Sequence, residues 1–115
     1  MKVLLIEDTK ELADSLRLFF ELEKNHVEMA HDLSEAKHFA SVTHFDIILL
    51  DIMLPDGDGR DFLRTIRSKN NNTPVIVMTA RSEISDRIDL LDIGADDYII
   101  KPVSYTHLTL PTILL

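Results

Sequence analysis

The chain has 115 residues, 45% of them hydrophobic and 28% charged, which suits one globular domain with a core of its own. Its net charge of −8 argues against this domain holding nucleic acid by itself, because a phosphate backbone requires a basic surface. There is no cysteine, which excludes disulfides and thiolate metal sites, and no apolar stretch long enough to span a membrane, so we expect a cytoplasmic protein without membrane contacts.

Short apolar runs alternate with amphipathic stretches along the chain, and this alternation predicts strands that alternate with helices. Ser34 is the expected cap of the second helix, and Gly94 is expected to end the fourth. Asp56 and Asp58 flank glycines and are expected to form a turn. We expect strands at residues 2–6, 26–30, 46–50, 74–78 and 97–100, and helices at residues 10–23, 34–40, 60–68 and 83–93.

Apolar residues spaced three or four positions apart predict the faces that the helices turn toward the core. The expected inward residues are Leu12, Leu16, Phe19 and Phe20 in the first helix, Phe62, Leu63 and Ile66 in the third, and Ile84, Ile88 and Leu91 in the fourth.

The predicted strands carry no polar face, which is typical of a parallel sheet covered by helices on both sides. Right-handed crossovers then favour an α/β fold of the flavodoxin-like kind, a doubly wound five-stranded parallel sheet with strand order 2-1-3-4-5. In such a sheet, ligands bind beyond the carboxyl ends of the strands, where strands one and three lie side by side.

Acidic side chains follow these two strands: Glu7 and Asp8 after the first, and Asp51 after the third. Three carboxylates at one sheet edge repel one another unless a cation joins them, and Mg²⁺, which prefers oxygen ligands, suits such a site. We expect Asp8 and Asp51 to bind Mg²⁺ directly and the backbone carbonyl of Met53 to supply a third ligand. Glu7 is expected to act through a bound water.

Asp51 could then act as a nucleophile and form an aspartyl phosphate. Two polar residues end the other strands at the same edge, Thr79 after the fourth and Lys101 after the fifth. Lys101 is expected to pair with phosphoryl oxygens and Thr79 to donate its hydroxyl to them, while the small Ala80 leaves room.

Four segments, at residues 3–8, 46–55, 77–80 and 94–102, carry a resemblance to a known family. Over residues 1–102 the chain resembles the receiver domain of bacterial two-component response regulators, which has the CheY-like version of this fold. The resemblance implies a signalling switch rather than an enzyme, phosphorylated by a sensor histidine kinase. It also implies that Asp51 is the phosphoacceptor, Glu7 and Asp8 the acidic metal pair, Thr79 and Tyr98 the switch residues, and Lys101 the phosphate-binding lysine.

Residues 79–81, 86–87 and 94–98 look most like the OmpR/PhoB class. Members of that class regulate transcription through a winged-helix DNA-binding domain after the receiver. They form homodimers through the face made by helix four, strand five and helix five, and Arg87, Asp96 and Asp97 match that face. Since the DNA-binding half is absent from this sequence, we expect contact with DNA only through that missing domain.

The pattern calls for a fifth helix after Pro102, and none is predicted. Residues 103–115 have no charged side chain and lack the apolar stripe of an amphipathic helix. They resemble the conceptual translation of a transposon-type sequencing-library adapter. We therefore expect a receiver at residues 1–102 and a non-native tail of adapter read-through at residues 103–115. The alternative is a natural irregular C-terminus.

Two other function classes compete with the signalling switch. An aspartate-nucleophile phosphatase of haloacid-dehalogenase type would place a second aspartate two positions after the nucleophile, where this chain has Met53. A phosphate-independent pseudo-receiver, acting only as an interaction surface, usually lacks one of the acids or the lysine, and all are present here. Turnover of a generic phosphate ester would favour the phosphatase, and failure of a folded chain to take up phosphate would favour the pseudo-receiver.

Overall fold

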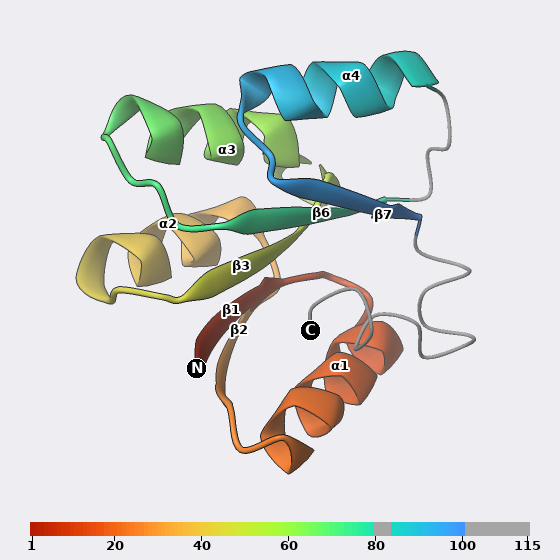
Figure 1. Ribbon diagram of the computed structural model, residues 1–115. Helices are drawn as coiled ribbons and strands as arrows, with labels where there is room; N and C mark the ends of the chain where they lie inside the picture. Colours follow the sequence, from red (N-terminus) through yellow and green to blue (C-terminus); the bar gives the residue numbers. More distant parts are fainter. Residues whose placement is uncertain (80–83, 101–115) are drawn as a thin grey trace.

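The computed structural model describes residues 1–79 and 84–100 of the chain (Figure 1). The expected domain boundary at residue 102, the missing fifth helix, the tail, Ala80 and Lys101 all lie outside these residues. Eleven elements are present in the described part of the chain. In order they are β1 (Lys2–Ile6), α1 (Lys10–Leu22), β2 (His26–Ala30), α2 (Leu33–Val42), β3 (Ile47–Asp51), β4 (Met53–Leu54), β5 (Gly57–Asp58), α3 (Gly59–Ser68), β6 (Val75–Thr79), α4 (Ile84–Ile93) and β7 (Asp97–Ile100).

Five of the strands form one parallel sheet in the order β2-β1-β3-β6-β7. This is the predicted 2-1-3-4-5 order, and the CheY-like α/β fold is confirmed. Figure 1 shows α1 on one side of the sheet and α2, α3 and α4 on the other. Because every strand runs the same way, the loops that follow their carboxyl ends gather at one edge.

The two faces of the sheet bury separate apolar clusters. On one face, β-strand side chains such as Ile6 and Leu50 pack with the fully buried Phe62 of α3 and Leu90 of α4. On the other face, α1 contributes Leu12, Ala13, Leu16 and Phe20. The inward residues predicted for the first and third helices are therefore confirmed, with Phe19 only half-buried at the margin.

The face predicted for the fourth helix is wrong. Ile88 and Leu91 are 54% and 42% exposed, whereas Leu90 is 1% exposed and Ile93 packs against the core. Apolar residues occur on both sides of this helix, so their spacing alone does not decide which side turns inward. The side chain of Ile84 lies outside the described set.

The cap predicted for the second helix is also wrong. α2 begins at Leu33, and its N-cap is Asp32, whose carboxylate accepts a hydrogen bond from Glu35 N at 2.8 Å. Asp and Ser are nearly equivalent as N-caps, so the sequence offered both, and the start of α2 at Leu33 makes Asp32 the capping residue.

Candidate functional site

The predicted carboxylates gather at the carboxyl edge of the sheet. Ile6 in β1 pairs with Leu50 in β3, so the residues that follow, Glu7 and Asp51, lie side by side. Glu7 N also donates to Ala30 O of β2 at 3.0 Å, which holds Glu7 in line with the strand. The register of three neighbouring strands thus fixes where these acids lie.

Glu7, Asp8 and Asp51 form a cluster in which one carboxylate oxygen from each lies within 4.8 Å of the others. Glu7 and Asp51 are buried, at 0% and 2% exposure, and Asp8 is exposed. Oxygens bound to one Mg²⁺ at about 2.1 Å are roughly 3 to 4 Å apart, so small movements or a bridging water would let all three acids hold one ion. The donor set, oxygen only and negatively charged, suits such a hard divalent cation.

Backbone groups orient these carboxylates. Thr9 N donates to Oε2 of Glu7 at 3.0 Å, and Met53 N donates to Oδ1 of Asp51 at 3.2 Å. The Nδ1 atom of His31 lies 3.3 Å from Glu7 O, which connects the start of α2 to the same edge. Met53 therefore lies next to the cluster through its backbone, while its side chain is 58% exposed.

The two predicted switch residues occupy the neighbouring strands. Asp51 pairs with Met78, so Thr79 ends β6 one position further along the same edge, and it is fully buried. Tyr98 in β7 pairs with Val77 of β6 and packs, half-buried, against the core beneath α4. The alternation along β6 gives Thr79 the same sheet face as Val77, which is the face that α4 covers.

Two of the three residues predicted for a dimer face, Asp96 and Asp97, make hydrogen bonds within the chain. Oδ2 of Asp96 accepts from Val75 N at 2.8 Å and from Arg67 Nη2 at 3.1 Å. Asp97 is exposed at the start of β7, and its Oδ1 accepts from Tyr98 N. Arg87 belongs to α4, and its side chain lies outside the described set.

Sequence reasoning predicted a turn after β3 but not the short hairpin that the structure shows there. β4 and β5 are antiparallel, with Met53 opposite Asp58, and at their tip Asp56 reaches α2. Oδ1 of Asp56 accepts from Leu33 N at 2.8 Å and Oδ2 from Ser34 N at 3.1 Å. The hydrogen bond from Leu33 N lowers the pKa of Asp56. The turn expected at Asp56 and Asp58 is present as this hairpin, but nothing in the sequence pointed to a partner 23 residues away.

A second missed feature joins the start of α3 to α4. Asp58 is the N-cap of α3 and accepts from Arg60 N at 2.9 Å. The Arg60 guanidinium contacts Asp58 through Nε at 3.2 Å and Asp89 of α4 through Nη1 at 2.8 Å. An acidic residue followed two positions later by a basic one is common on protein surfaces, so this pattern did not indicate a contact with Asp89, 29 residues away from Arg60.

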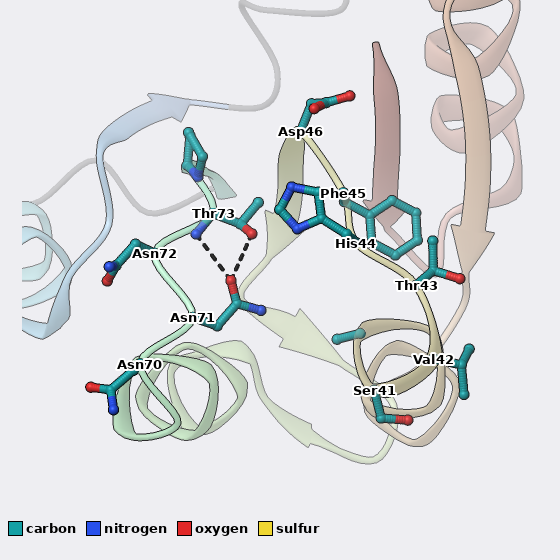
Figure 2. A pocket seen from close by; sticks show the side chains of 12 residues that line it. Ser41, Val42, Thr43, His44, Phe45, Asp46, Asn70, Asn71, Asn72 and Thr73 are labelled. Carbon is teal, nitrogen blue, oxygen red and sulfur yellow. Dashed lines mark hydrogen bonds between the residues drawn. The ribbon is translucent and has the colours of Figure 1, made fainter.

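The opposite edge of the sheet carries a shallow groove, lined by residues 40–46 and 70–74 (Figure 2). Oδ1 of Asn71 accepts there from the backbone N and the hydroxyl of Thr73, at 3.0 and 2.6 Å. Oδ2 of Asp46 accepts from Lys2 N at 2.7 Å. The groove lies at the amino ends of β3 and β6, so it has no part in the acidic cluster.

Among the helices of the described residues, none has the length and apolar character needed to cross a bilayer.

Comparison with known proteins agrees with this geometry. A family model described as the response regulator receiver domain matches residues 3–111. The transcriptional regulatory protein PmrA of Pectobacterium parmentieri is 39% identical over 94% of this chain and 49% of its own length. The transcriptional regulatory protein CusR of Escherichia coli strain K12 is 37% identical over 94% of this chain and 48% of its own length. The chain spans about half the length of the curated relatives it matches.

Solved structures give the same result. The receiver domain of Francisella response regulator 1452 superposes with a TM-score of 0.89 at 34% identity, over 98% of this chain and 93% of that one. The non-phosphorylated HemR receiver domain from Leptospira biflexa gives 0.86 at 31% identity, over 98% and 93%. The regulators matched in sequence, PmrA, MprA and CusR, are of the OmpR type, and they match over the receiver region only. The chain belongs to the response regulator receiver domain family, which is a signalling module rather than an enzyme.

Proposed function

We propose that this chain is a phosphorylation-activated switch in which Asp51 accepts a phosphoryl group from a sensor histidine kinase in the cytoplasm. The observation that carries the proposal is the position of Asp51, buried at the carboxyl end of β3 with Glu7 and Asp8 within 4.8 Å. These three carboxylates would hold Mg²⁺, with the carbonyl of Met53 as a further ligand. The bound ion supplies positive charge that offsets the charge of the incoming phosphoryl group.

The transfer exchanges one phosphorus bond for another. An oxygen of the Asp51 carboxylate attacks the phosphorus of a phosphohistidine, the new O–P bond forms as the N–P bond breaks, and the electron pair of the broken bond returns to the imidazole. The Met53 backbone N–H holds Oδ1 of Asp51 at 3.2 Å and so orients the nucleophile. We assign Lys101 to bind the phosphoryl oxygens as a point charge, and Ala80 to leave room for the group.

The switch follows from the added charge. Thr79 ends the strand next to Asp51 and would donate its hydroxyl to a phosphoryl oxygen, and Tyr98 would follow toward the space beneath α4. A difference of a few kcal/mol in the relative stability of two conformations would be enough to shift the population of the α4–β7 face. In the intact protein that face, with Arg87, Asp96 and Asp97, would support a homodimer and control a DNA-binding domain outside this chain.

The test is the intact mass of the chain after incubation with Mg²⁺ and acetyl phosphate, with circular dichroism to confirm folding. We expect one added phosphoryl group, lost in Asp51→Asn and lost without metal. Asp46→Asn is the matched control, because Asp46 is an exposed aspartate at the opposite edge of the sheet. No addition to a folded chain would favour the pseudo-receiver, and turnover of a generic phosphate ester would favour the phosphatase.

We also propose that the receiver unit occupies residues 1–102 and that residues 103–115 come from adapter read-through. The lack of charged residues and of a helical stripe in this segment supports the proposal. The family model extends to residue 111, so the segment needs its own test. Re-sequencing the 3′ end of the source gene is that test, and a genomic match to residues 103–115 would contradict the proposal.

A further inference from the structure

The hairpin after Asp51 brings Met53 to the acidic cluster, yet the hairpin lies outside the main sheet. Its base is fixed by Gly59 N, which donates to Ile52 O at 2.7 Å. A Cβ on Gly59 would lie 2.6 Å from Asp51 O, so the two ends of the hairpin are packed backbone to backbone. The base therefore cannot open without moving Asp51.

The tip of the hairpin is held by a different contact. Both carboxylate oxygens of Asp56 accept backbone N–H groups in the first turn of α2, from Leu33 at 2.8 Å and Ser34 at 3.1 Å. A negative charge at this place is also favoured by the dipole of α2. A Cβ on Gly57 would lie 2.9 Å from Leu33 Cδ1, so the tip packs closely on α2 as well.

The same turn of α2 is connected to the other side of the acidic cluster. His31, two residues before Leu33, has Nδ1 at 3.3 Å from Glu7 O, and Glu7 N is bonded to Ala30 O. A continuous path thus runs from Asp51 through the hairpin tip and the start of α2 back to Glu7. Between the hairpin and α2, the Leu33 side chain packs on Gly57, and Asp56 supplies two side-chain hydrogen bonds to the backbone of α2.

We propose that Asp56 is a positioning residue for the metal site: by holding the hairpin tip on α2, it fixes the Met53 backbone relative to Glu7 and Asp51. The inference rests on the proposed function, because it concerns the same ion. Among the described residues, the hydrogen-bond partners of the Asp56 carboxylate are Leu33 and Ser34, so it acts on the ion through the chain segment that joins it to Met53. Groups that orient metal ligands from outside commonly change metal affinity by about tenfold or more when removed.

The experiment is a calorimetric titration of the full chain with Mg²⁺, performed on the wild type, Asp56→Ala and Asp32→Ala, with a thermal melt of each. Asp32 is the matched control, because its carboxylate caps the same helix through Glu35 N and makes no hydrogen bond to the hairpin among the described residues. We expect both variants to melt at a lower temperature than the wild type. Only Asp56→Ala should raise the Mg²⁺ dissociation constant, by about tenfold.

Acetyl phosphate labelling gives a second readout. In Asp56→Ala the rate should fall at low Mg²⁺ and recover at saturating Mg²⁺, since the nucleophile itself is intact. Asp56→Asn retains one carbonyl acceptor and should show a smaller change in the same direction, which keeps the test usable if the alanine variant does not fold.

Equal Mg²⁺ affinity in wild type and Asp56→Ala would overturn the inference and leave Asp56 as a helix cap. An equal loss in Asp32→Ala would overturn it too, because the cause would then be general weakening of α2. A folded wild type that binds no Mg²⁺ would overturn the proposed metal site and, with it, the role of Asp56.

Discussion

Arg60 in α3 donates from Nη1 to Oδ2 of Asp89 in α4 at 2.8 Å, so Asp89 lies on the side of α4 that faces α3. Successive helical residues are about 100° apart, so a helix that turns Asp89 toward α3 also turns Leu90 and Ile93 inward. Ile88 and Leu91 then face solvent, which is where they are found, at 54% and 42% exposure. The ion pair is thus consistent with an inner face of α4 that includes Leu90 and Ile93.

A double-mutant cycle should measure this ion pair. The hydrogen bond to Asp89 raises the pKa of Arg60, and the Arg60 side chain is 18% exposed while that of Asp89 is 45% exposed. Because Asp89 is well solvated, we expect Arg60→Ala, Asp89→Ala and the double variant to give a coupling energy of only about 0.5–1 kcal/mol in urea unfolding. Additive effects of the two single changes would contradict the link.

The orientation of α4 predicts unequal effects of two adjacent leucines. Leu90 is 1% exposed in the core, so Leu90→Ala should lower the free energy of unfolding by about 2–5 kcal/mol. Leu91 is 42% exposed, so Leu91→Ala should change it by about 0.5 kcal/mol. Urea unfolding of the two variants compares them directly. The reverse order would restore the face predicted from the sequence.

Stability should depend on pH through Asp56. The Leu33 hydrogen bond holds the pKa of Asp56 below its usual value of 3.8, so the carboxylate is favoured more strongly in the folded than in the unfolded chain. Its contribution is therefore present above pH 3.8 and is lost as pH falls through the lower folded value. Urea unfolding of wild type and Asp56→Asn should show a difference at pH 6 that shrinks in this acid range. A constant difference would contradict the prediction.

The fold and the acidic cluster could be predicted because both depend on short-range patterns. Apolar runs located the strands, and the order of the parallel sheet then placed the acids after β1 beside the acid that ends β3. β1 and β7 have the predicted bounds, and β3 and β6 are shifted by one residue. Such shifts leave Asp51 and Thr79 at the same edge, so they do not affect the site.

What could not be predicted are contacts between distant elements. Asp56 and Leu33 are 23 residues apart, and Arg60 and Asp89 are 29 apart, so no local spacing relates either pair. Both pairs depend on how the loops pack once the sheet has formed. The inner face of α4 was predicted wrongly for the same reason, because Leu90 and Ile93 pack against residues of distant elements.

Arg67, in the last turn of α3, makes a second set of contacts between α3 and the segment that follows α4, in addition to the Arg60–Asp89 pair. Its Nη1 donates to the carbonyls of Asn71 and Thr73, each at 2.8 Å. Nε and Nη2 both donate to Gly94 O, at 3.1 and 2.9 Å, and Nη2 also reaches Asp96 at 3.1 Å. The planar guanidinium can satisfy these acceptors together because its donors point in several fixed directions.

Arg67→Lys should therefore be costly even though the charge is kept. A lysine ammonium carries its three donors on one atom, so it cannot reach carbonyls on both sides, and we expect a loss of about 1–3 kcal/mol in urea unfolding. Arg64→Lys is the matched control on the same helix, since Arg64 is 56% exposed and pairs only with Asp61 at 3.1 Å among the contacts of the described residues. Its effect should be about 0.5 kcal/mol or less. Similar values for the two variants would mean that charge alone, and not the shape of the Arg67 side chain, joins α3 to the start of β7.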